Sequence, residues 1–153
     1  MKHNLDQIDA HILRELQRDA SQSQRDLADR IGLSQNATWR RVKLLEERGI
    51  IKGHSARIAR EEVGLGLVVF AMIRTRNHSA DWLKRFRAHV GAIPDVIDFY
   101  RIGGDYDYLL KIVTRDMNSY DQVYQRLIDK LELETVTSYF AMEAIAENRP
   151  LDI

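Results

Sequence analysis

Two short stretches of this sequence carry residue types that can bind a charged partner. The first lies within residues 34–60, which hold seven Lys or Arg and two Asp or Glu, a net charge of +5. Its candidate contact residues are Ser34, Gln35, Asn36, Thr38, Arg40, Arg41, Lys43 and Lys52. Asn and Gln side chains can pair with adenine and Arg with guanine, whereas Lys suits a phosphate. The alternative is an ordinary solvated helix face, which composition alone favours.

The second stretch is a glycine-rich turn, whose candidate residues are Gly103, Gly104, Asp105, Tyr106 and Asp107. A Gly-Gly turn exposes backbone N–H groups that can hold a carboxylate, and an adjacent Asp can pair with an ammonium group. Together these groups fit a free amino acid. Ser138, further along the chain, would add a hydroxyl from a neighbouring subunit. The alternative is a plain hairpin turn stabilised by Asp, with Ser138 an ordinary strand residue, and turn chemistry alone favours it.

The sequence lacks the residue patterns of an enzyme or a metal site. Cysteine is absent, which removes disulfides, thiolate ligands and a cysteine nucleophile. Asp105 and Asp107 alternate along an extended chain and so face opposite sides, which argues against a catalytic carboxylate pair. The five histidines show no ligand spacing, and there is no Gly-x-Ser-x-Gly motif. We therefore predict no catalytic residue, no metal and no cofactor, with an amino acid as the expected effector.

Three helices joined by short turns are expected in the first third of the chain. Apolar residues recur at helical spacing over residues 5–16, which predicts the first helix. A second helix starts at Ser23 and ends at Gly32, a residue that suits a helix C-terminus. Ser34 then caps a third helix that reaches about Arg48. Two short helices with a tight turn between them, behind a packing helix, form a helix-turn-helix arrangement.

The third helix has an inward and an outward face. Helical spacing places Thr38 and Leu45 on the inward face, whereas Arg40 lies on the opposite side. Arg41 is expected either to contact DNA or to bridge two helices. Trp39 is expected first to pack against the fold and second to contact the DNA backbone. An extended piece after the helix would make this a winged variant. In this arrangement the start of the third helix projects outward, where it can enter the major groove.

The rest of the chain alternates short β-rich runs with helical stripes. Strands are expected over 68–75, 96–102, 106–114 and 136–145, and helices around 82–90 and 120–131. This order, βαββαβ, is the ferredoxin-like topology. Both helices would cover one face of the sheet and leave the other bare, although it carries apolar and aromatic residues. A bare apolar sheet of that size is typical of pairing with another copy of the chain.

Length and composition limit the class of protein. A chain of 153 residues makes one ordinary domain or two small ones. Its 23 Lys and Arg balance 23 Asp and Glu, which excludes a wholly basic coat protein and an acidic disordered tail. The first ten residues have no apolar core of a signal peptide, and no apolar run approaches the ~20 residues of a membrane helix. We therefore expect a soluble, cytoplasmic protein without a membrane partner.

Four motifs in order resemble the leucine-responsive regulator family, Lrp/AsnC, over essentially the whole chain. They read LDQIDAHILRELQRDA at the start, DLADRIGLSQNATWRRVKLLEERGIIKG in the helix-turn-helix, GLGLVVFAMIRT at the first sheet strand and YRIGGDYDYLLKIVTRD at the central turn. The resemblance implies an α+β protein. Residues 1–53 would form a winged helix-turn-helix DNA-binding domain, 54–66 a linker strand and hinge, and 67–153 a ferredoxin-like effector-binding and assembly domain.

The resemblance also implies a transcription regulator that binds double-stranded DNA as a dimer, tetramer or octamer. An amino acid would bind near the turn after the second sheet strand, between sheet domains, and the closest branch includes sulfur-amino-acid sensors. Two third helices would then enter successive major grooves of an imperfect palindrome. The alternatives are a small ligand-binding enzyme or a scaffold, each using the helix-turn-helix for docking. The missing catalytic patterns count against the enzyme, and the +5 charge of residues 34–60 counts against the scaffold.

Overall fold

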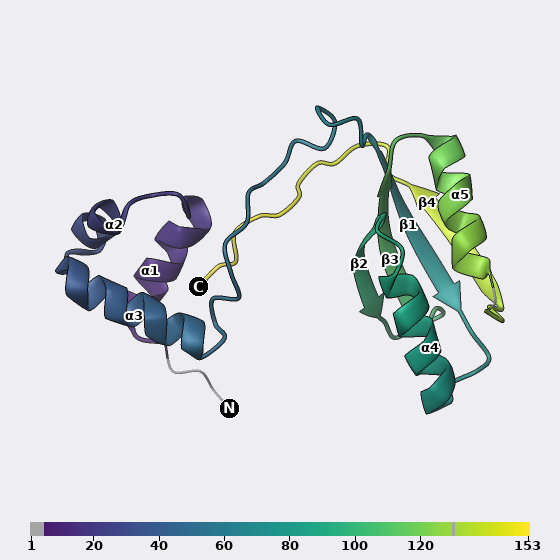
Figure 1. Cartoon of the computed structure of the whole chain (residues 1–153), viewed down its shortest axis with the longest axis horizontal. Coiled ribbons are helices and arrows are strands. Elements are labelled where there is room, and N and C mark those ends of the chain that lie inside the picture. Colours follow the sequence, from purple (N-terminus) through teal and green to yellow (C-terminus); the bar gives the residue numbers. More distant parts are fainter. Residues whose placement is uncertain (1–4, 130) are drawn as a thin grey trace. The chain divides into compact units, whose positions relative to one another are not determined.

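A computed structural model of the chain describes residues 5–129 and 131–153. It consists of two compact units, one formed by the chain up to Arg57 together with Ala146–Ile153 and the other by Ile58–Ile145. Figure 1 shows the order of the elements along the chain. Over the described residues, no helix has the length and apolar character needed to cross a membrane.

The first unit is built from three helices, α1 (Gln7–Arg18), α2 (Gln24–Ile31) and α3 (Gln35–Glu47). Each begins at a side-chain cap, from Asp6, Ser23 and Ser34 respectively, which satisfies a free N–H of the first turn. Gly32 ends α2 with a φ of +73°, a left-handed conformation that glycine adopts without strain. The predicted helix-turn-helix is therefore confirmed.

The core of this unit joins the first and third helices. Ile12 and Leu13 on α1 pack with Leu45 on α3, and Ile50 and Ile51 after α3 pack against the same cluster. Ile12, Leu13 and Leu45 are among the apolar residues that helical spacing in the sequence places inward. Burial of this cluster stabilises the angle at which α3 crosses the other two helices.

The segment after α3 differs from its prediction. Residues 52–59 have no strand pairing, and residues 60–64 form turns in which, for example, Leu65 N–H donates to the Arg60 carbonyl oxygen at 2.8 Å. The linker strand expected within 54–66 is therefore a loop in this structure. A strand forms only where another chain segment pairs with its N–H and C=O groups, and the described residues of this chain provide no partner there.

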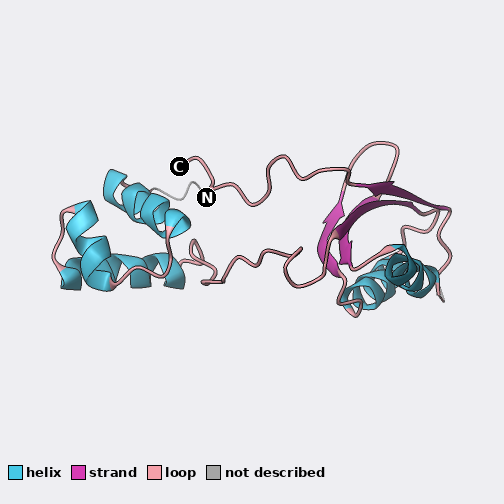
Figure 2. Cartoon of the chain, turned by 90° about the horizontal axis from the view of Figure 1, so that it is seen from above, coloured by secondary structure: helices cyan, strands magenta, loops and turns pink. Residues whose placement is uncertain are grey.

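The second unit is a four-stranded antiparallel sheet with two helices. Its elements are β1 (Leu67–Arg74), α4 (Ala80–Gly91), β2 (Val96–Arg101), β3 (Tyr108–Thr114), α5 (Met117–Ile128) and β4 (Thr135–Phe140). The strand order is β2-β3-β1-β4, so the split βαββαβ topology is confirmed. Figure 2 shows both helices on the same side of the sheet. The opposite side carries no helix.

The two faces of the sheet differ in what covers them. Side chains such as Val69, Ile73 and Leu110 point toward the helices and are fully buried. An aromatic cluster completes this core, in which Phe86 stacks on Trp82 at a ring-centroid distance of 4.8 Å. On the uncovered face, Phe70 of β1 lies between its cross-strand neighbours Lys111 of β3 and Tyr139 of β4. This agrees with the expectation of a bare sheet face that carries apolar and aromatic side chains.

Candidate DNA-reading and effector sites

The solvent-facing side of α3 carries the polar residues that the sequence singles out. The Ser34 hydroxyl accepts a hydrogen bond from Ala37 N–H and so starts the helix. Gln35, Asn36 and Arg40 follow with exposed side chains on that side. These residues lie at the beginning of the helix that the short turn sets across α2. The surface has the donors and acceptors that can recognise base edges.

Thr38 and Arg41 turn toward the fold instead. Thr38 is fully buried, and its hydroxyl donates to the Ser34 carbonyl oxygen at 3.0 Å. Arg41 Nη1 lies 2.7 Å from Asp6 Oδ2 and 2.7 Å from Asp9 Oδ1. The hydrogen bonds to Asp6 and Asp9 raise the pKa of Arg41 above its usual range. Of the two roles expected for Arg41, this geometry agrees with the bridge between helices.

Further basic side chains surround the end of α3. Lys43 Nζ pairs with Glu46 Oε2 at 2.7 Å, and this hydrogen bond is the main reason that the pKa of Glu46 is lowered. His54 Nε2 lies 3.7 Å from the other oxygen of the same carboxylate. Lys52 is exposed in the extended segment that follows. Lys43 and Lys52 are long cations at the surface, the kind of group that contacts phosphates.

Trp39 was expected to pack against the fold, and the structure contradicts this. Its side chain is 47% exposed and lies on the outward side of α3, next to Arg40. The correct signal was its helical position, because Trp39 is four residues after Gln35 and therefore shares its face. Of the two roles expected for Trp39, this exposure disagrees with packing, and a contact with the DNA backbone stays a prediction.

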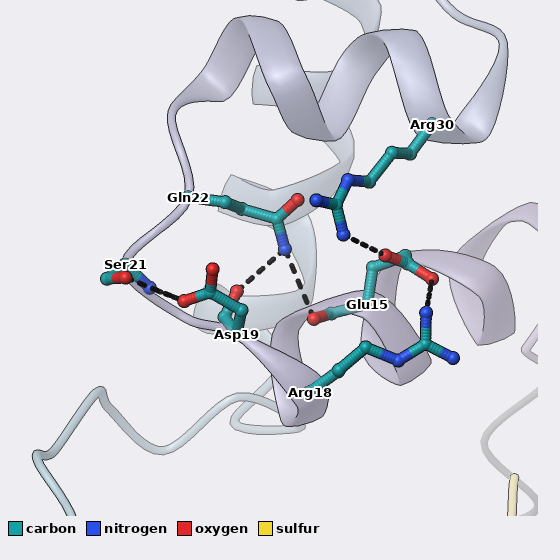
Figure 3. A network of polar contacts seen from close by, with 6 residues as sticks. All are labelled: Glu15, Arg18, Asp19, Ser21, Gln22 and Arg30. Atoms are coloured by element: carbon teal, nitrogen blue, oxygen red, sulfur yellow. Dashed lines mark hydrogen bonds and ion pairs between the residues drawn. The ribbon is translucent and has the colours of Figure 1, made fainter.

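A polar network behind this surface fixes α2 relative to α1, and Figure 3 shows its side chains. Glu15 is almost fully buried and pairs with Arg18 at 3.2 Å and with Arg30 of α2 at 3.0 Å. The hydrogen bond from Arg30 is the largest cause of the lowered pKa of Glu15. The Gln22 amide donates to the backbone oxygens of Glu15 and Asp19 at 3.1 and 2.6 Å. No local sequence pattern indicates this network, because it joins side chains of α1, α2 and the turn between them.

The glycine-rich turn joins β2 to β3 at one end of the sheet. Gly104 has a φ of +124°, a conformation that favours glycine, and Gly103, Gly104 and Asp105 are exposed. Arg74 Nε at the end of β1 donates to the Asp105 carbonyl oxygen at 2.7 Å. The guanidinium carbon of Arg74 also lies 5.3 Å from the centroid of the Tyr106 ring. Arg74 therefore holds this turn in place, while the Asp105 carboxylate points to no described partner.

Asp107 has a different environment from Asp105. Its carboxylate accepts a hydrogen bond from Thr75 N–H at 2.8 Å, and its own N–H donates to the Ile73 carbonyl oxygen at 2.9 Å. These two bonds continue the pairing of β1 with β3 beyond the end of the strands. The carboxylate of Asp107 is therefore occupied by the fold of this chain.

Tyr106 and Ser138 lie on opposite faces of the sheet. The Tyr106 hydroxyl is 3.1 Å from Thr137 Oγ1, whose side chain belongs to the uncovered face. Ser138, one residue on, turns to the helix-covered face and hydrogen-bonds the Tyr120 hydroxyl. Burial raises the pKa of Tyr120. Tyr106 is thus part of the turn, whereas Ser138 of the same chain contacts Tyr120 and does not reach the turn.

Comparisons with known proteins match two successive parts of the chain. Residues 5–52 match the family model described as winged helix-turn-helix DNA-binding. Residues 68–151 match the model described as Lrp/AsnC ligand binding domain. The chain is 41% identical to the DNA-binding transcriptional activator DecR of Escherichia coli, over 97% of this chain and 99% of that protein.

Two crystal structures resemble the whole chain. An AsnC family transcriptional regulator from Agrobacterium tumefaciens is 43% identical and superposes with a TM-score of 0.92, covering 97% of both chains. A transcriptional regulator from Neisseria meningitidis, solved in complex with L-Met, is 31% identical with a TM-score of 0.91 over the same 97% of both chains. The motifs, the topology and these matches agree from one end of the chain to the other, and the protein belongs to the Lrp/AsnC family.

Proposed function

We propose that this protein is a sequence-specific DNA-binding transcriptional regulator of the cytoplasm whose action an amino acid modulates. The observation that carries the proposal is the exposed side of α3, where Gln35, Asn36 and Arg40 lie at the start of a capped helix. In a helix-turn-helix these positions reach base edges in the major groove. Arg40 would pair with guanine, and Gln35 or Asn36 with adenine.

Phosphate contacts complete the DNA surface in this proposal. Lys43 and Lys52 are exposed, and residues 34–60 carry a net charge of +5. Ser34, at the N-terminal end of α3, adds a helix terminus that attracts a phosphate oxygen. Trp39 adds an apolar edge beside Arg40, suited to a thymine methyl group or a sugar. The Thr38 and Arg41 side chains are engaged within the fold, so they are not the base-reading residues here, and a direct DNA contact by either stays a prediction.

Two copies of the chain would assemble through the uncovered face of the sheet. Phe70, Tyr139 and Leu109 lie on that face, and Tyr139 is 55% exposed in the single chain. Contiguous exposed aromatic and aliphatic side chains mark an interaction surface. Such a dimer would present two α3 helices to half-sites about 34 Å apart on an imperfect palindrome. Tetramers or octamers would form from these dimers.

An amino acid would bind at the turn between β2 and β3, at a contact between subunits. The Asp105 carboxylate suits the ammonium group, and the N–H groups around Gly103 and Gly104 suit the carboxylate. Ser138 would come from a neighbouring subunit. The relative from Neisseria meningitidis binds L-Met, which favours a sulfur amino acid as the effector class. The ligand would regulate by binding two assembly states with different affinity.

The Arg40→Ala variant tests the DNA-reading assignment. Loss of a bidentate base contact is expected to weaken specific binding by about 1–3 kcal/mol, with a smaller effect on random DNA. Affinities for a selected genomic fragment and for a scrambled fragment are measured at the same salt concentration. The control is Arg87→Ala, which removes an exposed Arg from helix α4 of the other unit. Equal loss on both fragments would show that Arg40 contacts only phosphate.

A further inference from the structure

Residues 146–153 follow β4 yet belong to the three-helix unit. We call them the return segment. The Gln17 side chain of α1 makes two hydrogen bonds to Leu151 in this segment. Its Nε2 donates to the Leu151 carbonyl oxygen at 3.1 Å, and its Oε1 accepts from Leu151 N–H at 2.7 Å. One amide side chain thus pairs with both backbone groups of a single residue, as a neighbouring β-strand would.

A second helical residue and an apolar pocket extend this contact. Arg14 Nη1, one turn before Gln17 on α1, donates to the Ile153 carbonyl oxygen at 2.7 Å. The Ile153 side chain borders a cavity of about 570 Å³ whose apolar lining includes Leu13, Leu16 and Ile50. Ile153 is 37% exposed and Leu151 is 75% exposed, so Ile153 is the more buried of these two apolar side chains. The contact therefore combines hydrogen bonds from Arg14 and Gln17 with the partial burial of the Ile153 side chain.

Each of these contacts is weak by itself, because hydrogen bonds at an exposed site add little net free energy. The return segment is covalently joined to β4, however, and a tethered ligand binds at a high effective concentration. The same strand pairs with β1, with Val69 opposite Phe140, and β1 begins where the linker from the three-helix unit ends. Two neighbouring strands of one sheet therefore each continue into the three-helix unit.

We infer that the Arg14–Gln17 side of α1 is a docking site for the return segment of the same chain, and that this segment is a second tether between β4 and the DNA-binding unit. A tether from β4 restricts the positions that α3 can take while the sheet assembles or binds a ligand. Its regulatory consequence rests on the proposed function, whereas the docking itself does not.

Thiol crosslinking tests the docking in the full chain. The protein has no cysteine, so Gln17→Cys combined with Leu151→Cys introduces the only two thiols. A short bis-maleimide avoids the strict geometry that a disulfide demands. The expected product is a crosslink within one chain, seen as a shifted monomer band on a denaturing gel. The control pair is Gln7→Cys with Leu151→Cys, because Gln7 is exposed on α1 and lies about 15 Å along the helix from residue 17.

The outcomes separate the alternatives. A shifted monomer for the Gln17 pair, far stronger than for the Gln7 pair, supports the proposal. A crosslinked dimer would show that the segment docks on another copy and would overturn it. Equal reaction of the two pairs would mean that the segment does not dock at Gln17. These results do not depend on DNA or on an effector, so they hold even if the proposed function fails.

The Gln17→Ala variant then tests the tether's regulatory role, with Gln7→Ala as its control. The DNA affinity without amino acid is expected to change little. The ratio of the DNA affinities with and without amino acid is expected to approach one. An unchanged response in Gln17→Ala would overturn the regulatory role and leave the docking intact. If the unaltered protein shows no amino-acid response, the effector part of the proposed function fails, and the regulatory role fails with it.

Discussion

Arg41 Nη1 on α3 lies 2.7 Å from Asp9 Oδ1 on α1, and Asp9 is almost fully buried. This ion pair joins the helix that would read DNA to the helix that carries the core of the unit. Because Asp6 shares the same guanidinium nitrogen, two carboxylates fix the position of one arginine. The outward side chains of α3 are thereby presented at a defined angle. Arg41 acts in this account on the orientation of α3, and a direct DNA contact by it stays a prediction.

Replacing Arg41 with Ala is expected to destabilise the three-helix unit. The change leaves the buried Asp9 carboxylate without its partner, and an unpaired buried polar group costs about 1–3 kcal/mol. Chemical denaturation followed by far-ultraviolet circular dichroism measures the loss. Arg25→Ala is the matched control, because Arg25 is exposed on α2. A variant as stable as the unaltered protein would show that the ion pair does not hold α3.

The stability of the same unit is expected to fall in acid. The Asp9 N–H, followed by Arg41, lowers the pKa of Asp6, and Arg30 lowers that of Glu15. A carboxyl group with a pKa lower in the folded than in the unfolded state stabilises the fold above its unfolded pKa. This contribution disappears as the pH falls through the folded pKa. Urea midpoints should be nearly constant from pH 7 to about pH 5 and decrease below about pH 4. A midpoint that rises on acidification would contradict this.

The two aspartates of the turn are expected to behave differently. Asp105→Ala should abolish the response to amino acid and leave DNA binding and stability unchanged, because its carboxylate has no partner among the described residues. Asp107→Ala should lower stability, because it removes the acceptor for Thr75 N–H. Thermal unfolding and DNA affinity with and without amino acid measure both. An unchanged response in Asp105→Ala would place the effector elsewhere.

Assembly is expected to depend on the uncovered face of the sheet. Tyr139→Asp should convert the assembly to monomers, because a dimer would bury the new charge against Phe70 and its neighbours. Met117→Asp is the control, because Met117 is also 55% exposed but lies at the start of α5 on the helix-covered side. Sedimentation or light scattering gives the mass. A Tyr139→Asp protein with unchanged mass would show that the subunits assemble through another surface.

The elements were predictable where periodicity decides them. The spacing in α3 places Thr38 and Leu45 inward, as found. The end of α2 at Gly32 was predictable, because helices commonly end at a residue in the left-handed backbone conformation, which glycine adopts readily.

What depends on contacts between distant residues could not be predicted. Arg41 alone does not reveal that Asp6 and Asp9 lie opposite it, and Ser138 alone does not reveal the Tyr120 hydroxyl. Local sequence also does not show whether an extended segment has a partner strand. For this reason a strand is expected within residues 54–66, where the structure has a loop. The docking of Leu151 on Gln17, 134 residues away, is invisible to any local pattern.

The most direct test of the central claim is binding of the purified protein to fragments of its own genome. Fragments that co-purify at moderate salt are sequenced, with and without a pool of the twenty amino acids. We expect a short set of enriched palindromic sites whose enrichment changes with the pool. Enrichment that does not change with the pool would contradict the claim that an amino acid modulates DNA binding. No enrichment of any sequence would contradict the claim that this protein reads DNA.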